Sequence, residues 1–368
     1  MIKYPMAFPI FGKEEKKNLL DCVESGWVSS RGKYIEKFEK LFADHCGTKY
    51  AVAVSNGTAA LQLALMATGV QAGDEVIIPN LTFGATANVP MLMGIKPVLV
   101  DVDKNTWNID VAEIEKNISK KTRAVIPVHL YGLPCEMDKI RKIAKKYNLK
   151  VIEDAAEAHG AVYKKRKAGN WSDIGCFSFF GNKIITTGEG GMCTTNSKAL
   201  FEKMITVRNN GMGIGRKYWH DIVGCNFRMT NMQAALGVGQ MTRVDKFIEK
   251  KKLIAGWYME EIKKQQVEGY YQQEEKGATS SWWMFTLILP KINDLSELIK
   301  YLGERGIESR PIFFPLSIMP AFAKLRKSKT LKNSLSLAGK GISLPMNLKL
   351  ERNDIKEIVG ALKLYLSK

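Results

Sequence analysis

The sequence predicts an α/β fold with a mostly parallel central sheet and a smaller C-terminal α+β domain. From about residue 50 to residue 195, short apolar runs alternate with helical patterns. The apolar runs are continuous, as expected for parallel strands that are covered on both faces. Residues 231–265 then form one long helical pattern, apolar first and Lys-rich later, after which the character of the chain changes. We therefore expect a large domain over residues 1–245, which includes the N-terminal segment, and a small domain over residues 246–368.

The individual elements follow from these patterns in chain order. The uncharged stretch 76–95 is long enough to suggest a membrane span, but it contains two prolines and two asparagines, so we expect a strand, a loop and a buried helix there. The expected strands of the large domain cover residues 51–55, 75–79, 96–102, 124–128 and 149–154, and its helices cover residues 58–68, 110–118 and 136–147. In the small domain the expected strands cover residues 282–289 and 307–314, and the helices cover residues 294–305 and 353–366.

Composition limits the class of protein. The 368 residues include 45% hydrophobic and 25% charged residues, which excludes a disordered chain and a disulfide-stapled mini-protein. The formal net charge of +18 leaves nucleic acid, a membrane surface and an anionic small molecule open as partners. The six cysteines form no CxxC pair and the four histidines lack metal-ligand spacing, so we expect a reduced, cytoplasmic protein without a metal site. The N-terminal apolar run is broken by Pro5 and Pro9, which makes it a poor secretory signal.

Candidate ligand-binding residues follow the first two strands. In an open parallel sheet, ligands bind beyond the carboxyl ends of the strands. Gly57 allows close approach of the backbone, and Thr58 is expected to cap the next helix, whose N-terminus could hold an anion. Phe83 follows the second strand and could stack on a flat ring. A plain turn with a helix cap, and a core aromatic, are the structural alternatives.

Titratable residues mark the later part of the same edge. Asp154 ends an apolar strand, and Glu157 and His159 follow it closely. A buried carboxylate needs a partner, which could be a structural Arg or Lys or a protonated ring nitrogen. Lys183 lies among apolar and Gly-rich residues, where burial would lower its pKa and free the amine to act as a nucleophile or a base. The alternative for Lys183 is an ordinary surface lysine.

Together these residues match the requirements of one ligand. A lysine amine, a carboxylate for a pyridinium nitrogen, a stacking aromatic and a helix N-terminus for a phosphate are what pyridoxal 5'-phosphate needs. Asp154 would keep the ring nitrogen protonated. Lys183 would hold the cofactor and move protons during the reaction. His159 is included as a further candidate catalytic residue.

Five motifs, in order, resemble the sugar aminotransferases of the DegT/DnrJ/EryC1/StrS family. They are Asn-Gly-Thr-Ala-Ala-Leu (56–61), Glu-Asp-Ala-Ala-Glu-Ala-His-Gly (153–160), Phe-Ser-Phe-Phe-Gly-Asn-Lys (177–183), Gly-Glu-Gly-Gly-Met (188–192) and Gly-Cys-Asn-Phe-Arg-Met-Thr-Asn (224–231). The resemblance implies the type I pyridoxal-phosphate enzyme fold. It implies that Lys183 forms the Schiff base, that Asp154 pairs with the ring nitrogen and that Phe83 stacks on the ring. It further implies phosphate contacts from Thr58, Ala59 and Ser178, and from Asn226 of a neighbouring subunit in a homodimer.

Two departures from the family pattern point to a substrate class. Glu157 stands where the family usually has Gln, and Phe180 stands where it usually has His. With Tyr-Trp-His-Asp (218–221), these features are most similar to the branch that aminates C4 of GDP-4-keto-6-deoxymannose to give GDP-perosamine. That resemblance implies L-glutamate as amino donor and pyridoxamine phosphate as the intermediate form of the cofactor. Candidate contacts to the sugar nucleotide are Trp27, Ser30, His220 and Arg310.

The sequence leaves other functions open. Related branches act on UDP-linked keto sugars or on an eight-carbon acidic sugar, and some relatives are dehydratases in which a His replaces the lysine, against which Lys183 argues. A non-catalytic pyridoxal phosphate sensor would keep the same residues. A polyanion-binding or nucleic-acid-binding protein would concentrate its basic residues on one face. Here the lysines are spread over 116–150, 245–264 and 324–340 on expected outer helix faces, so we expect neither nucleic acid nor a membrane as partner.

Overall fold

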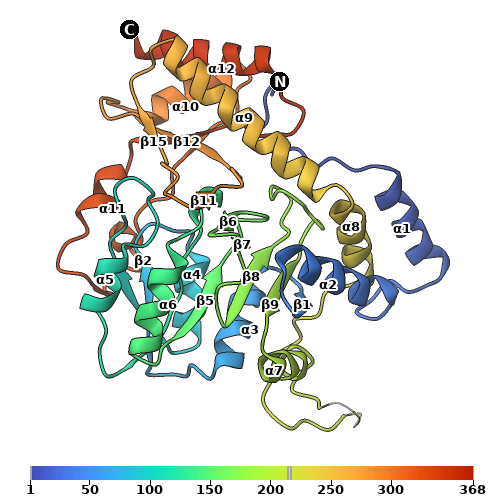
Figure 1. Ribbon diagram of the computed structural model, residues 1–368. Helices are drawn as coiled ribbons and strands as arrows, with labels where there is room; N and C mark the ends of the chain where they lie inside the picture. Colours follow the sequence, from blue (N-terminus) through green and yellow to red (C-terminus); the bar gives the residue numbers. More distant parts are fainter. Residues whose placement is uncertain (1, 214, 216–217, 368) are drawn as a thin grey trace.

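An eight-stranded sheet forms the framework of the molecule (Figure 1). The computed structural model describes residues 2–213, 215 and 218–367. The strands of this sheet are β1 (Tyr50–Val54), β2 (Glu75–Pro79), β3 (Lys96–Val100), β4 (Thr122–Val125), β5 (Lys150–Asp154), β8 (Ile174–Ser178), β9 (Gly191–Thr195) and β14 (Arg326–Lys327). They lie in the order β1-β9-β8-β5-β4-β2-β3-β14. The pairings from β14 to β8 are parallel, whereas β9 runs antiparallel to both β8 and β1.

Helices cover both faces of this sheet. Val76 and Ile78 of β2 are buried in the cluster that contains α3 and α4 residues, whereas Ile77 is buried in the cluster that contains α5 and α6 residues. Because successive strand residues point to opposite faces, a continuously apolar strand is buried on both sides. Helix α3 is apolar around most of its circumference because the sheet and neighbouring helices enclose it. The helices of this part are α1 (Lys13–Glu24), α2 (Lys33–Cys46), α3 (Gly57–Thr68), α4 (Ala85–Leu92), α5 (Val111–Lys116), α6 (Met137–Lys146), α7 (Lys198–Arg208) and α8 (Asn231–Met241).

A four-stranded sheet, in the order β10-β12-β15-β13, forms the core of the C-terminal part. Its strands are β10 (Tyr270–Tyr271), β12 (Phe285–Ile288), β13 (Arg310–Pro311) and β15 (Gly341–Leu344), and its helices are α9 (Val244–Lys264), α10 (Leu295–Glu304) and α12 (Arg352–Leu366). Tyr258 of α9 stacks on Phe285 of β12 with ring centroids 4.8 Å apart. Figure 1 shows α9 extending from α8, beside the large sheet, to α12 above the small one.

Two short segments connect these parts. Strands β6 (Val162–Tyr163), β7 (Arg166–Lys167) and β11 (Ala278–Thr279) form a small third sheet. After β13 the chain returns to the large sheet, where β14 pairs with β3. There Ser334 of α11 (Lys332–Leu337) donates its N–H and hydroxyl to the Asp101 carboxylate, at 2.9 and 2.7 Å. The division of the chain at residue 245 stays a prediction.

The expected strands of the large sheet and the expected helices agree with the structure to within a few residues, and 76–95 forms β2, a loop and α4. Two expectations were wrong in detail. Residues 231–265 form two helices, because the chain turns at Arg243, whose guanidinium donates to the Ile10 carbonyl and pairs with Glu15. Helix α3 is capped by Asn56 rather than Thr58.

Several features bear on the expected class of protein. All six cysteines lie in the described part of the chain and are free thiols. No helix among the described residues is both long and apolar enough to cross a bilayer. The same residues hold no cluster of side chains suited to a metal ion.

Candidate active site

A cavity of about 520 Å³ lies at the carboxyl ends of the strands of the large sheet. One side is lined by residues that end or follow these strands: Asn56 after β1, Phe83 after β2 and Asp154 at the end of β5. The other side is lined by residues from the C-terminal part, among them Trp283 and Arg310. This is the edge at which an open α/β sheet binds ligands.

Lys183 lies in this cavity, in the loop between β8 and β9, with a side chain that is only 11% exposed. Its Nζ lies 3.8 Å from Oε1 of Glu157. Burial lowers the pKa of Lys183, and the carboxyl groups of Glu157 and Asp154 oppose that change in part. A larger fraction of this amine is therefore neutral near pH 7 than in an ordinary lysine, which is the state that attacks a carbonyl or accepts a proton.

Glu157 is the second titratable group of the cavity. Burial raises its pKa to about 7, although Lys183 and a hydrogen bond from the backbone act in the other direction. That hydrogen bond is donated by the N–H of Tyr131 to Oε2, at 2.8 Å. Tyr131 has a φ of 55°, an uncommon conformation for a bulky side chain, and this conformation directs its amide at the carboxylate. Glu157 therefore changes its protonation state near neutral pH, beside the Lys183 amine.

Asp154 and Glu153 are neighbours with different roles. Oδ2 of Asp154 accepts a hydrogen bond from the Thr86 hydroxyl at 2.9 Å, and burial raises the pKa of Asp154. Its carboxylate would therefore gain most from a cationic partner in the cavity. Burial also opposes ionisation of Glu153, but hydrogen bonds from groups that include His129 lower its pKa overall. Glu153 is a structural carboxylate, whereas Asp154 lines the cavity.

The opposite end of the cavity offers an anion site. Gly57 and Thr58 begin α3, whose first turn leaves backbone N–H groups without helical partners. Oδ1 of Asn56 accepts the N–H of Ala59 at 2.8 Å and fixes the turn. A Cβ on Gly57 would come within 2.8 Å of Cβ of Ser178. Only glycine therefore leaves room between the helix N-terminus and Ser178.

Aromatic rings form a wall between these two ends. Phe83 is 61% exposed, and its ring centroid lies 5.8 Å from that of Phe313. Tyr131 stacks on Phe313 at 5.3 Å and on Trp283 at 6.3 Å. Phe83 was expected here from the sequence. Tyr131, Phe313 and Trp283 were not, because they come from segments that the pattern of strand ends does not single out.

His159 lies outside the cavity, and its catalytic role is corrected. Its ring is fully buried among Phe42, Phe177 and Phe179, with centroids 5.5 to 6.3 Å apart. Neither ring nitrogen has a hydrogen-bond partner within the described residues. Burial lowers the pKa of His159 to about 3. A neutral imidazole in an apolar layer cannot exchange protons with a ligand in the cavity.

The other predicted residues divide into two groups. Thr58, Phe83, Asp154, Glu157, Ser178, Lys183 and Arg310 line the cavity together with Gly57. The N–H of Ala59 serves the helix cap instead, and Oδ1 of Asn226 accepts from Nε of Arg228 at 2.9 Å. Trp27, Ser30 and His220 lie on the exposed or half-exposed surface and do not line this cavity.

Comparison with known proteins identifies the family. Residues 9–363 match the model of the DegT/DnrJ/EryC1/StrS aminotransferase family. The chain belongs to that family. It is 45% identical to the GDP-perosamine synthase of Caulobacter vibrioides, covering 97% of this chain and 96% of the relative. It is 41% identical to the GDP-perosamine synthase of Escherichia coli O157:H7, covering all of both chains.

Solved structures that resemble this chain confirm the predicted fold class. A 3-amino-5-hydroxybenzoic acid synthase superposes with a TM-score of 0.93 at 26% identity and covers 99% of each chain. An E. coli GDP-4-keto-6-deoxy-D-mannose-3-dehydratase with bound hydrated pyridoxal phosphate superposes with a TM-score of 0.90 at 26% identity, covering 98% of this chain and 100% of the dehydratase. The cavity residues fit pyridoxal phosphate. Gly57 leaves room for the phosphate, and Phe83 can stack on the ring. Asp154 can pair with a protonated ring nitrogen, and Lys183 offers the amine. The sequence-based prediction of the cofactor agrees with this fit.

Proposed function

We propose that this family member is a pyridoxal-phosphate-dependent aminotransferase acting on a nucleotide-linked 4-keto-6-deoxy sugar, with L-glutamate as donor. The substrate is GDP-4-keto-6-deoxymannose and the product GDP-perosamine. The observation that carries this proposal is the buried Lys183 amine beside Glu157 in a cavity that fits the cofactor. The full-length similarity to two GDP-perosamine synthases supports the substrate.

The residues of the cavity have separate roles in the transfer of the amine. When bound, the cofactor supplies an electron sink for the carbon that loses a proton. Asp154 would hold the proton at the ring nitrogen of the bound cofactor, and Lys183 Nζ would accept a proton from one carbon and return it to another. Glu157, with a pKa of about 7, buffers the charge of the lysine. Arg310, held by Glu308 at 2.8 Å at the cavity wall, binds an anionic group of a substrate.

A second copy of the chain completes the site in this proposal. Trp27, Val28, Phe180, Trp219 and Val223 are between 43% and 88% exposed. Trp27 and Val28 belong to one segment and Trp219 and Val223 to another, and exposed large apolar side chains of this kind favour an interaction surface. We infer that the homodimer covers them. In it Trp27, Ser30, His220 and Asn226 would serve the site of the partner subunit.

A panel of 4-keto sugars linked to GDP, UDP and dTDP tests the substrate. Purified protein is incubated with cofactor, L-glutamate and each sugar, and the amino product is identified by mass. Conversion of the GDP-linked sugar alone supports the proposal. Preference for a UDP-linked or dTDP-linked sugar would replace GDP-4-keto-6-deoxymannose as the substrate, and a deoxygenated product would indicate a dehydratase instead.

A further inference from the structure

Trp283 lies directly over the amine of Lys183. The ring belongs to the segment before β12, far from Lys183 in the sequence, and is only 5% exposed. Nζ of Lys183 lies 3.8 Å from the centroid of the indole. At this distance the negative face of an indole attracts an ammonium, and the attraction is strongest where water is excluded.

Three contacts fix the position of the indole. Its Nε1–H donates to the carbonyl of Asn182, the residue before Lys183, at 2.8 Å. The ring of Tyr131 stacks on it at 6.3 Å. The carbonyl of Trp283 accepts a hydrogen bond from Nζ of Lys251 at 3.2 Å. The indole is therefore tied to the loop that carries Lys183, and the backbone of Trp283 is tied to a buried lysine.

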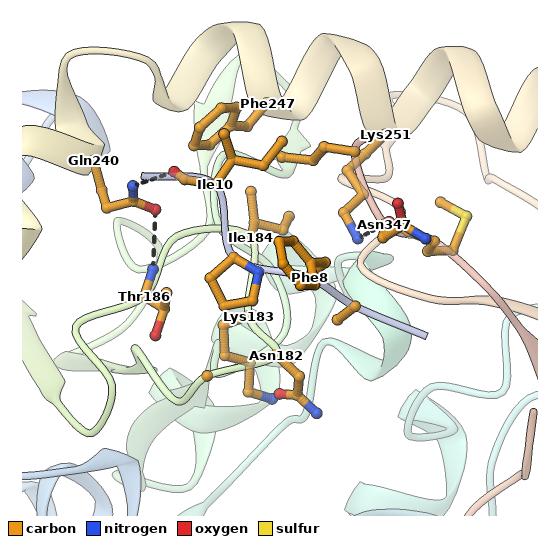
Figure 2. A pocket seen from close by; sticks show the side chains of 15 residues that line it. Phe8, Ile10, Asn182, Lys183, Ile184, Thr186, Gln240, Phe247, Lys251 and Asn347 are labelled. Atoms are coloured by element: carbon orange, nitrogen blue, oxygen red, sulfur yellow. Dashed lines mark hydrogen bonds between the residues drawn. The ribbon is translucent and has the colours of Figure 1, made fainter. Parts of the chain in front are cut away.

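Lys251 connects this arrangement to the long helix α9. Figure 2 shows its side chain extending from the helix toward Asn347, with Asn182 and Lys183 on the far side of the segment that carries Phe8. Nζ of Lys251 also donates to the carbonyl of Met346 at 2.6 Å. Burial lowers the pKa of Lys251 to about 7. Helix α9, the segment before β12 and the segment after β15 thus meet at one buried amine.

We propose that Trp283 is a positioning residue for Lys183, whose protonated form its indole face stabilises, and that Lys251 holds Trp283 in place. This inference rests on the proposed function for its catalytic meaning, but its physical claim concerns an amine and a ring. The charged groups that face Lys183 are Glu157, at 3.8 Å, and Asp154, and both favour the ammonium while burial opposes it. The indole adds a third favourable group that carries no charge. Its attraction for the ammonium therefore persists when Glu157 is neutral, and it opposes part of the effect of burial.

Fluorinated tryptophan tests the indole without changing its size. Fluorine withdraws electron density from the ring face and weakens its attraction for a cation. The full-length chain, freed of cofactor with hydroxylamine, is labelled with acetic anhydride over a range of pH. Mass spectrometry of the Lys183 peptide then gives the pKa of that amine. We expect fluorotryptophan protein to show a lower Lys183 pKa by up to about one unit, a change of up to about tenfold in the ratio of amine to ammonium.

The variant Trp283→Phe supplies the matched control, because fluorotryptophan also replaces the other six tryptophans. In the Trp283→Phe background, fluorination should leave the pKa of Lys183 unchanged. An equal Lys183 pKa with and without fluorine in the natural sequence would overturn the proposal. A fluorine-dependent shift of the Lys183 pKa that is equally large in the Trp283→Phe background would also overturn it.

Two further variants keep the proposal open to refutation if fluorinated protein does not fold. Trp283→Leu, which removes the ring, should lower the Lys183 pKa further than Trp283→Phe, and equal values would contradict the proposal. Lys251→Met should lower it in the same direction, whereas Lys246→Met, on the exposed side of α9, should not. Equal labelling profiles of Lys183 in Lys251→Met and Lys246→Met would contradict the claim that Lys251 holds Trp283 in place. With pyridoxal phosphate bound, the pH dependence of kcat/KM should shift to lower pH in the same variants, and the variants should rank as they do by Lys183 pKa.

Discussion

Replacing Glu157 with glutamine should stabilise the cofactor-free chain, and the gain should grow as the pH rises. Glu157 is buried, and its pKa is raised from 4.5 to about 7. Between these two values the unfolded chain releases a proton that the folded chain retains, so the wild type loses stability as the pH rises through this interval. Glutamine keeps the volume and still accepts the N–H of Tyr131, but it does not ionise.

The difference in the free energy of unfolding follows from the distance between the two pKa values of Glu157. At about 1.4 kcal/mol for each pKa unit, the distance from 4.5 to about 7 corresponds to about 3 kcal/mol at pH 8. Near pH 4.5 the carboxyl of the folded wild type is neutral, so the two proteins should differ little. The assay is urea unfolding of both proteins at pH 4.5 and pH 8, at one protein concentration, followed by fluorescence and circular dichroism.

Glu153→Gln is the matched control, because Glu153 precedes Asp154 at the same strand end but has a lowered pKa. Burial opposes its ionisation, yet the hydrogen bonds from His129, Ser172 and Gly169 outweigh burial. Glu153→Gln should therefore lose stability relative to the wild type as the pH rises, the opposite sign. If the advantage of Glu157→Gln does not grow between pH 4.5 and pH 8, Glu157 is not the buried carboxyl that this account requires.

Three further predictions concern catalysis and binding. Lys183→Ala should lower amine transfer by more than about a hundredfold and keep the wild-type circular dichroism spectrum; a smaller loss would place the proton transfer elsewhere. Gly57→Ala places a Cβ within 2.8 Å of Ser178 and should weaken pyridoxal phosphate binding about tenfold in equilibrium dialysis, whereas Gly303→Ala, where a Cβ meets open space, should not. Arg310→Met should raise the KM of L-glutamate or of the nucleotide sugar about tenfold with little change in kcat, and unchanged KM values for both would exclude Arg310 from binding.

The sequence was sufficient for the residues that end or follow strands. Asp154 and Glu157 stand out because a carboxyl group at the end of an apolar strand needs a partner. Gly57 stands out because a glycine precedes an apolar helix, and Lys183 because its neighbours are apolar. All four line the cavity, because parallel strands bring their carboxyl ends to one edge of the sheet.

The sequence did not reveal contacts made between distant segments. Trp283 belongs to an apolar run that reads only as a strand, and nothing nearby in the chain indicates that its ring faces Lys183. The prediction of a catalytic role for His159 was wrong for the opposite reason. Its spacing from Asp154 suggested a shared site, but the turn after β5 directs its ring into the phenylalanine layer. At the break between α8 and α9, Arg243 contacts Glu15, a residue far away in the sequence that no local pattern indicates.

Transfer of nitrogen from glutamate to the sugar tests the central claim most directly. Purified protein with pyridoxal phosphate, ¹⁵N-labelled L-glutamate and GDP-4-keto-6-deoxymannose is analysed by mass spectrometry of the nucleotide sugar, beside Lys183→Ala. We expect ¹⁵N in the sugar product of the wild type and none in that of the variant. A sugar that gains no ¹⁵N, or gains it equally with Lys183→Ala, would contradict it.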